Sequence, residues 1–236
     1  MQDWSKRKQT GEGDADSTRM ALIEAGLDRF GVKGYDAAST REIAAAAGAN
    51  IASIAYHFGG KEGLRRACAE YVAGLIGSVA RSVFGADFEK AESAAAALPA
   101  AEARTELVNG MMRLLRFLLL QPQAKLIVRF MLREIMSPSI ALDIIYGGIF
   151  RPVHRRLCAL WSAATGKQME SEEVRLAVFA MLGQAVYFRI AQEVVQRRMD
   201  WREVGEAEVE SISRILIANL NDSLDRDARA AGGERK

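Results

Sequence analysis

The stretch Ser39–Leu64, with sequence STREIAAAAGANIASIAYHFGGKEGL, constrains the fold most strongly. Ser39 and Glu42 have the S-x-x-E spacing of a capping box, in which the two side chains satisfy backbone N–H groups at a helix start. Gly48 follows an alanine-rich helix where a residue tolerant of positive φ is needed to end it. Asn50 can cap a second helix. Two short helices joined by a glycine-containing turn are typical of a helix-turn-helix, whose second helix enters the DNA major groove.

Composition and patterning predict an all-α protein. Half of the 236 residues are hydrophobic and only 7% are aromatic, and alternating β-branched runs bounded by turn residues are missing. No apolar run approaches the ~20 residues of a membrane span, and the N-terminus lacks the apolar core of a secretion signal. Cys68 and Cys158 lack metal-ligand neighbours, so we expect buried thiols in a reducing cytoplasm, with no metal and no cofactor. The net charge of +2 neither supports nor excludes DNA binding.

We expect about nine helices in two domains. Residues 1–16 are polar and indicate a disordered arm, with an arm that touches DNA as the alternative. Residues 17–65 are predicted to form a three-helix helix-turn-helix DNA-binding domain. Residues 66–226 would form a larger helical domain for ligand binding and dimerisation, and residues 227–236 a frayed tail.

Within the larger domain, proline and glycine mark the breaks. Residues 85–103 are expected to be mainly a connector. A helix over 139–164 is expected to be interrupted at Gly147-Gly148 and kinked at Pro152, because proline removes a backbone hydrogen bond and crowds the carbonyl four residues earlier. Two further helices are predicted at about 171–199 and 206–226.

Several positions recur together in one known family, in order and with matching spacing. They are Thr18-Arg19 through Ala25, Phe30, Gly34-Tyr35, Thr40 to Ala44, Ala47-Gly48, Ile54, Tyr56 to Phe58 and Lys61 to Leu64. On these positions, residues 18–64 resemble the TetR family of transcriptional regulators. The run over residues 47–64, and more weakly the pattern at 151–154, resembles a subgroup with a CerR-type C-terminal domain. One departure is Ala55, where many family members carry an aromatic residue that helps to hold a phosphate.

The predicted recognition helix runs from Ile51 to Phe58. Ile54 and Phe58 lie four residues apart and should face the small core. The outward positions can contact thymine methyl groups, base edges or phosphates, and the helix starts at 40 and 61 can attract phosphate oxygens. The candidate DNA-binding residues are Thr40, Arg41, Ile51, Ala52, Ser53, Tyr56, His57 and Lys61. A core position for Tyr56, and a packed or solvated one for His57, are the structural alternatives. Arg65 and Arg66 are expected to be ordinary surface charges.

The resemblance implies a small-molecule pocket in the C-terminal half, and the two last helices are expected to dimerise. The candidate pocket residues are Met112, Phe117, Arg129, Phe130, Arg133, Tyr146, His154, Trp161 and Tyr187, each with plain core or a solvated face as its other reading. Lys125, Arg129 and Arg133 share one stripe and could form a cationic wall for an anionic ligand. The candidate dimer-interface residues are Phe179, Leu182, Gly183, Val186, Ile190, Ile212, Ile215 and Leu216, which would pack as four helices across a two-fold axis.

These features together predict a cytoplasmic repressor that binds a palindromic DNA operator as a homodimer and is released by a small-molecule effector. Release would follow if the helix starting at Lys61 swings and changes the separation of the two recognition helices. The alternatives are a transcriptional activator and a DNA-binding dimer without effector. An enzyme is not predicted, because no glycine-rich phosphate loop, zinc spacing or nucleophile motif is present.

Overall fold

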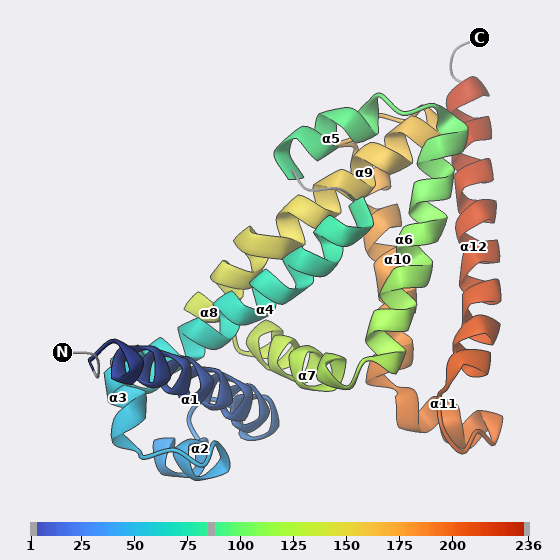
Figure 1. The fold of residues 1–236 in the computed structure, drawn as a ribbon. Helices are drawn as coiled ribbons and strands as arrows, with labels where there is room; N and C mark the ends of the chain where they lie inside the picture. The colour runs from blue at the N-terminus through green and yellow to red at the C-terminus, as the bar shows by residue number, and fades with distance from the viewer. Residues whose placement is uncertain (1–3, 85–87, 234–236) are drawn as a thin grey trace. The chain divides into compact units, whose positions relative to one another are not determined.

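The computed structural model describes residues 4–84 and 88–233, with side chains at positions 15–78 and 92–233. These described residues form twelve α-helices, one short π-helix and no strand, which confirms the predicted all-α class (Figure 1). The helices are α1 (Trp4–Lys33), α2 (Thr40–Ala46), α3 (Ala52–Phe58), α4 (Lys61–Phe84), α5 (Phe88–Ala96), α6 (Ala100–Leu120), α7 (Pro122–Met136), α8 (Ile140–Ile145), the π-helix η1 (Tyr146–Phe150), α9 (Arg151–Thr165), α10 (Glu172–Ile190), α11 (Gln192–Met199) and α12 (Glu206–Gly233). Within this part of the chain no single helix is long and apolar enough to cross a membrane, and α10 with α11 meets that test only as a pair bent by 74°.

Helix α1 begins at Trp4 rather than after Asp16, which corrects the expected disordered arm over residues 1–16. Residues 1–3 lie outside the described residues. The buried apolar face from Leu22 to Phe30 holds the C-terminal half of α1 in place. Extending an existing helix adds one hydrogen bond per residue without a new nucleation step, and no proline interrupts this segment.

The described residues contain more helices than the nine expected, for local reasons. Helix α5 lies within the predicted connector over 85–103, where the alanine-rich sequence has high helix propensity. Residues 171–199 form α10 and α11 rather than one helix, because Ala191 leaves helical geometry at φ −96° and ψ 20°. The interrupted helix over 139–164 is divided into α8, η1 and α9.

The predicted interruption at Gly147-Gly148 takes the form of the π-helix Tyr146–Phe150. Pro152 lies in the first turn of α9, where its missing N–H has no intrahelical partner to lose. A single π-helical turn inside a longer helix is a common way to absorb such a misfit.

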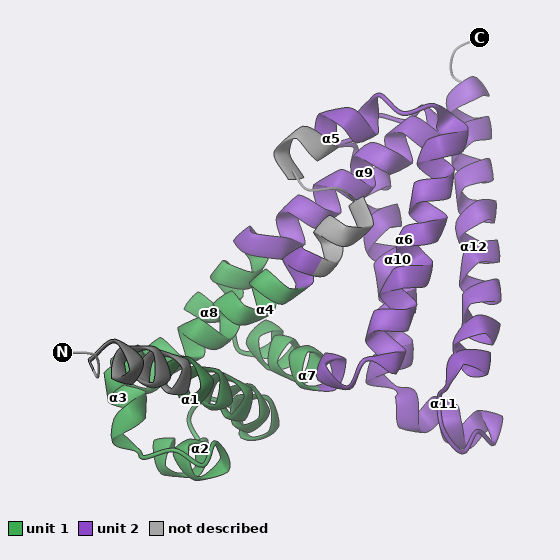
Figure 2. Ribbon diagram, in the orientation of Figure 1, with its two compact units in different colours: residues 1–75, 126–146 green, residues 76–125, 147–236 purple. Residues whose placement is uncertain are grey.

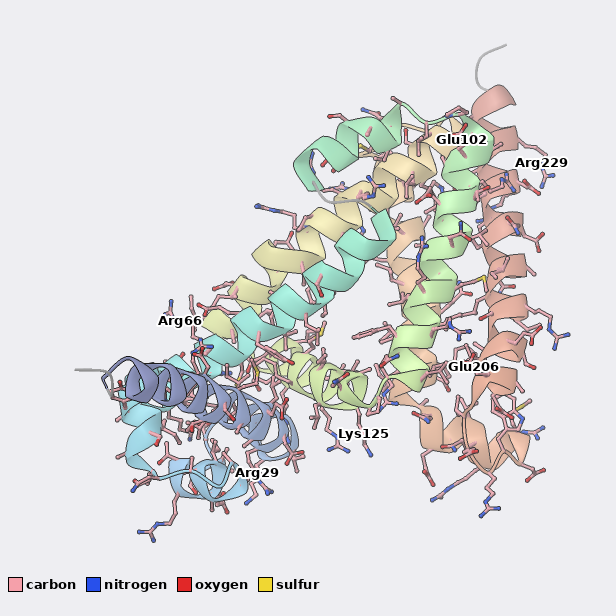
Figure 3. The ribbon with its side chains drawn as sticks, viewed as in Figure 1. Arg29, Arg66, Glu102, Lys125, Glu206 and Arg229 are labelled. Atoms are coloured by element: carbon pink, nitrogen blue, oxygen red, sulfur yellow. The ribbon has the colours of Figure 1, made fainter. Side chains whose placement is uncertain are left out.

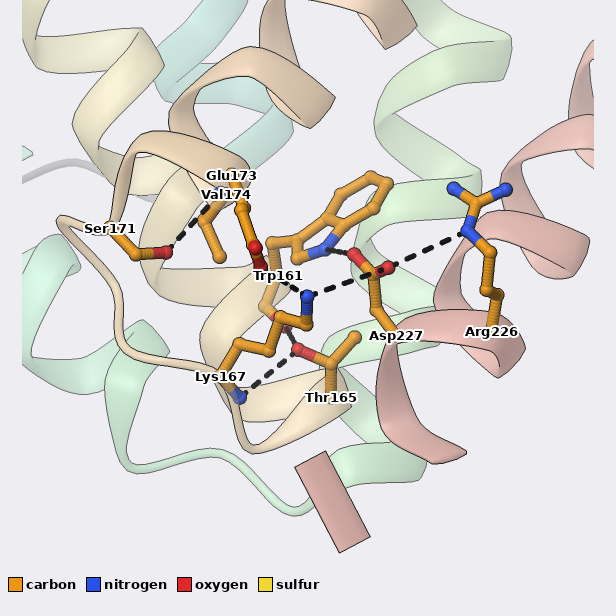
Figure 4. A network of polar contacts seen from close by, with 8 residues as sticks. All are labelled: Trp161, Thr165, Lys167, Ser171, Glu173, Val174, Arg226 and Asp227. Carbon is orange, nitrogen blue, oxygen red and sulfur yellow. Dashed lines mark hydrogen bonds and ion pairs between the residues drawn. The ribbon is translucent and has the colours of Figure 1, made fainter. Parts of the chain in front are cut away.

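Helix α12 continues to Gly233, which corrects the expected frayed tail over its described part. Asp227 anchors this end, because its buried carboxylate accepts a hydrogen bond of 3.0 Å from the Trp161 indole N–H (Figure 4). The side chains of Lys167 and Arg226 approach the other carboxylate oxygen at 3.9 and 3.7 Å. Three cationic or N–H groups around one buried carboxylate hold the last turns of α12 in helical form.

The chain divides into two compact units (Figure 2). The first unit contains residues 1–75 and 126–146, and the second contains residues 76–125 and 147–236. The predicted DNA-binding segment 17–65 therefore lies wholly in the first unit, together with most of α7 and with α8.

The core of the first unit brings α1, α2, α3, α4 and α7 together. Gly26 lets α1 approach α4 closely, because a Cβ there would lie 2.9 Å from the Cys68 sulfur. Cys68 is buried, as expected, and this burial raises the pKa of its thiol. The largest buried side chains are Leu22, Ile23, Leu27 and Phe30 of α1, Ile43 of α2, Ile54 of α3, Leu64 of α4, and Ile127 and Phe130 of α7.

In the second unit α5 packs on α9, and α6, α9, α10 and α12 pack around the fully buried Trp161. Two ion pairs of 2.6 Å connect α6 with α12, one from Arg104 to Asp225 and one from Arg116 to Glu206 at the first turn of α12. The order of these pairs shows that α6 and α12 run antiparallel. Exposed ion pairs of this kind add little to the free energy of unfolding. Their main effect is to fix the register of α6 against α12.

Candidate nucleic-acid interface

The start of α2 has the predicted capping box. The Ser39 hydroxyl oxygen accepts a hydrogen bond of 3.1 Å from the Glu42 N–H, and the Ser39 N–H donates to a Glu42 carboxylate oxygen at 3.3 Å. Lys33 donates to the same carboxylate at 2.7 Å, and this hydrogen bond, followed by the Ser39 backbone, lowers the pKa of Glu42. Gly48 has the predicted positive φ of 63° after α2. The turn into α3 is therefore fixed at both of its ends.

Helix α3 presents one face to the core and the other to solvent. Asn50 accepts a hydrogen bond of 2.9 Å from the Ala52 N–H, as expected of a residue at the helix start. Ile54 is buried, and Phe58 is half-buried beneath the Arg19 guanidinium at 5.6 Å. Tyr56 is 83% exposed, which excludes the core position that was its structural alternative.

The other predicted contacts on α3 share this outer surface. Ile51 and Ala52 are exposed, and Ser53 and His57 are half-buried. The His57 ring lies edge-on to the ring of Tyr56 at 4.9 Å. A tyrosine hydroxyl, an imidazole and a serine hydroxyl are the groups that position a helix on phosphates, while small apolar side chains can meet a thymine methyl.

Two helix starts flank this surface in the sequence. Thr40 is half-buried and Arg41 is exposed in the first turn of α2. Lys61, in the first turn of α4, donates a hydrogen bond of 3.3 Å to the Asp36 carbonyl oxygen and lies 4.4 Å from the centre of the Tyr35 ring. An ammonium group has three donors, so this arrangement orients Lys61 and leaves capacity for a phosphate.

The structure corrects the expectation that Arg65 is an ordinary surface charge. Its guanidinium donates two hydrogen bonds, both of 2.9 Å, to the two carboxylate oxygens of Glu134 on α7. The Arg65 side chain is 11% exposed and that of Glu134 only 3%. A sequence signal existed, because Glu134 continues the apolar stripe of Ile127 and Phe130, where an unpaired carboxylate would be costly. Arg66 is exposed, as expected (Figure 3).

Four of the predicted ligand-pocket residues lie in the first unit, and two of them have a structural role there. Phe130 is fully buried. Arg133 donates a hydrogen bond of 3.1 Å to the carbonyl oxygen of Val32 at the end of α1. Arg129 is half-buried and Tyr146 is exposed on η1. Lys125, at the start of the predicted cationic stripe, is exposed and belongs to the second unit (Figure 3).

The remaining predicted pocket residues lie in the second unit but do not form one wall. Trp161 lines a pocket of about 80 Å³ between α6, α9, α10 and α12. His154 is half-buried, with Nε2 at 3.2 Å from the Arg175 carbonyl oxygen and its ring 4.1 Å from that of Phe179. Burial is the main cause that lowers the pKa of His154. Met112 and Tyr187 are exposed and Phe117 is half-buried. The pocket residues that sequence reasoning missed are Met111, Ala177, Ala180, Met181, Gln184, Leu216, Asn219, Leu220, Ser223 and Arg226.

The predicted dimer-interface residues fall into two groups. Ile212 and Leu216 are buried within the second unit, so they belong to the core of the single chain. Phe179, Ile190 and Ile215 are each more than half exposed, Gly183 is exposed, and Leu182 and Val186 are half-buried. On α10 the exposed apolar positions also include Leu176 and Tyr187.

Comparison with known proteins agrees with this geometry. Residues 22–68 match the family model of the bacterial regulatory proteins of the tetR family. Residues 103–225 match the C-terminal domain of the HTH-type transcriptional dual regulator CecR. The chain is 33% identical over 207 residues to CecR of Shigella flexneri, which covers 87% of this chain and 91% of that protein.

Two solved structures share the fold at low sequence identity. A TetR-like transcriptional regulator from Rhodococcus sp. RHA1 superposes with a TM-score of 0.56 and 17% identity, covering 88% of this chain and 96% of its own. A gamma-butyrolactone receptor described as ArpA-like has a TM-score of 0.54 and 19% identity, covering 89% and 99%. The family expected from the sequence is thus confirmed, and the expected C-terminal subgroup, termed CerR-type above, corresponds to the CecR type. This chain belongs to the TetR family of transcriptional regulators, with a helix-turn-helix DNA-binding domain and a C-terminal domain of the CecR type.

Proposed function

We propose that this regulator is a ligand-responsive repressor that binds a palindromic operator as a homodimer in the cytoplasm. The observation that carries the proposal is the outer surface of α3, where Tyr56 projects almost completely into solvent while Ile54 anchors the helix from behind. Thr40, Arg41, Ile51, Ala52, Ser53, His57 and Lys61 are the remaining proposed DNA contacts. An exposed tyrosine hydroxyl can donate to a phosphate oxygen, so the exposure of Tyr56 supports a role in DNA binding.

Dimerisation is supported by an exposed apolar stripe on α10. Leu176, Phe179, Gly183, Tyr187 and Ile190 recur at intervals of three or four residues and therefore share one face of the helix. Ile215 adds an exposed apolar position on α12. A second copy that packs its own α10 and α12 against this face would give the dimer two recognition helices, as a palindromic operator with two half-sites requires.

Release by a small-molecule effector is supported by the gamma-butyrolactone receptor that shares the fold. Helix α4 starts next to the recognition helix and continues into the second unit, so we propose it as the element whose movement separates the half-site contacts. An effector achieves this only by binding the two states unequally. The turn η1, with Gly147 and Gly148, is the proposed flexible point.

Two observations favour other modes of control. The relative CecR is described as a dual regulator, which supports activation at some promoters as a second candidate. The pocket beside Trp161 is small, at about 80 Å³, which supports a dimer without effector, because drug-sized ligands fill roughly 300–1,000 Å³.

The DNA assignment is tested with duplexes that the purified protein selects from a random library. Titration of a labelled selected duplex with Tyr56→Ala should show weaker binding, and Lys61→Ala should also lower the dependence of affinity on salt by about one phosphate contact. Met136→Ala removes another large and highly exposed side chain, 78% exposed at the end of α7, and is the matched control, for which affinity should not change. Unchanged binding by both Tyr56→Ala and Lys61→Ala would show that the site is misplaced.

The oligomer is tested by sedimentation of Phe179→Glu, which places a charge on the exposed stripe and should yield a monomer with weakened operator binding. Met136→Glu, an equally drastic change at a more exposed methionine on α7, is the control and should leave the assembly unchanged. A screen of small molecules for release of the selected duplex then addresses the effector.

A further inference from the structure

The carboxylate of Glu134 is held from three sides inside the first unit. Arg65 donates from Nε and Nη2 at 2.9 Å each, and the Ser139 hydroxyl donates at 2.6 Å. Ser139 also accepts a hydrogen bond of 3.1 Å from the Ala141 N–H, so the same hydroxyl caps α8. A buried ion pair keeps one geometry only when its remaining oxygen and N–H positions are also satisfied, and here three donors fix the carboxylate.

The aromatic ring of Tyr35 connects this ion pair with Lys61. The Arg65 guanidinium lies 4.6 Å and the Lys61 ammonium 4.4 Å from the centre of the same ring, and the two cations are four residues apart on α4. Lys61 also donates to the Asp36 carbonyl oxygen, in the loop that carries Tyr35. A cation over an aromatic ring gains electrostatic energy only at short range, so the place of the ring determines where Lys61 is held.

Helix α7 also holds the beginning of this loop. The Arg133 guanidinium donates to the Val32 carbonyl oxygen at 3.1 Å. At Gly31, an added Cβ would lie 3.2 Å from both the Arg129 Cβ and the Phe130 nitrogen, so α1 packs on α7 without spare room. The segment that carries Tyr35 and Asp36 is therefore fixed by α7 on one side and by α4 on the other.

We propose that Glu134 is a positioning residue for DNA binding. Through Arg65 and Tyr35 it fixes the Lys61 ammonium at the start of α4, where that group meets a phosphate. The proposal rests on the proposed DNA contact of Lys61 and adds a residue on α7 that touches no DNA. The rival explanation is a buried ion pair that contributes only to folding.

A double-mutant cycle separates the two explanations. The wild-type protein and the variants Lys61→Ala, Glu134→Gln and Lys61→Ala/Glu134→Gln are titrated with a labelled selected duplex at several salt concentrations. The titrations use conditions in which circular dichroism shows each variant to be folded. Glu134→Gln should weaken binding by the same factor as Lys61→Ala and lower the salt dependence by about one phosphate contact. It should cause no further loss when Lys61 is already alanine, because the two residues act through one contact.

Milder variants keep the test decisive if Glu134→Gln does not fold. Arg65→Lys keeps the positive charge but loses the two-pronged geometry, and Ser139→Ala removes one of three hydrogen bonds; both should weaken binding only while Lys61 is present. Glu70→Gln, an exposed carboxylate on α4, is the matched control and should have no effect.

The outcomes distinguish the proposals. Equal losses from the Glu134 variant with and without Lys61 would overturn the positioning role while leaving DNA binding intact. The positioning role would also be overturned if the Lys61→Ala variant bound the duplex as well as the wild type. If the wild-type protein selected no duplex, the proposed function itself would fail, and the positioning role with it.

Discussion

The substitution Gly63→Ala tests how closely the recognition helix α3 packs against the start of α4. An added Cβ at this position would lie 2.9 Å from the carbonyl carbon of Phe58, closer still to its oxygen, and 3.5 Å from the Phe58 Cβ. Phe58 is the last residue of α3, and its carbonyl is backbone that cannot rotate away as a side chain could. Gly63→Ala must therefore push the end of α3 away from the first turn of α4.

The magnitude follows from two opposing effects. Replacing glycine by alanine inside a helix stabilises it by about 0.5–1 kcal/mol, because the unfolded chain loses freedom. Forcing an extra methyl group into a filled site costs about 1–3 kcal/mol, and here the obstacle is backbone, which favours the upper end. We expect the unfolding free energy to fall by about 1–2 kcal/mol. The free energy of DNA binding should fall by more than that, since the displaced element is the recognition helix.

Gly74→Ala is the matched control, because it makes the same substitution in the same helix where no atom lies within 4 Å of the added Cβ. It should stabilise the protein by about 0.5–1 kcal/mol and leave DNA binding unchanged. Guanidinium unfolding followed by circular dichroism, at one fixed protein concentration, measures the first quantity, and titration of a selected duplex measures the second. Equal unfolding free energies and equal affinities for the two alanine variants would refute the close approach of α3 and α4.

Two further predictions concern the second unit. Trp161→Phe removes the indole N–H that donates to the buried carboxylate of Asp227, so it should lower the unfolding free energy by about 1.5–3 kcal/mol, the contribution of a hydrogen bond to a charged group. Trp201→Phe is the control and should lower the unfolding free energy, measured by circular dichroism, by less. Equal losses of unfolding free energy would contradict the anchoring role of Trp161. Cys158 is fully buried, and this burial raises the pKa of its thiol, so iodoacetamide should label it only after unfolding, as mass spectrometry would show. Labelling of the native protein at the rate of a free thiol would contradict that burial.

The features that the sequence predicted well are those encoded by residues a few positions apart. The capping box of Ser39 and Glu42, the positive φ of Gly48 and the burial of Ile54 each depend on contacts within one or two helical turns. Such contacts leave a fixed spacing in the sequence. The exposure of Tyr56 follows for the same reason, because Ile54 fixes which face of α3 is turned inward.

The features that the sequence could not predict depend on which distant segments meet. Arg65 and Glu134 are 69 positions apart, and nothing in the spacing of either residue names its partner. The candidate pocket residues rested on the family resemblance, residue type and one helical stripe, and of these only Trp161 lines the described pocket in the second unit. The continuation of α12 past Asp227 likewise depends on a tryptophan 66 positions earlier.

The segment 126–146 is the clearest example of a contact between distant segments that the sequence does not indicate. Dividing the chain by order along the sequence assigns α7 and α8 to the ligand-binding domain, yet this segment belongs to the same compact unit as α1, α2 and α3. The reason is chemical, because α7 supplies Glu134 to Arg65 and Arg133 to the Val32 carbonyl oxygen, while Ser139 joins the start of α8 to the same carboxylate. A displacement of α7 or α8 would therefore act on the DNA-binding helices through hydrogen bonds inside their own unit. Breaking one partner of such a pair leaves a buried charge uncompensated, at a cost of about 3–5 kcal/mol, so α7 and α4 are expected to move together rather than to separate.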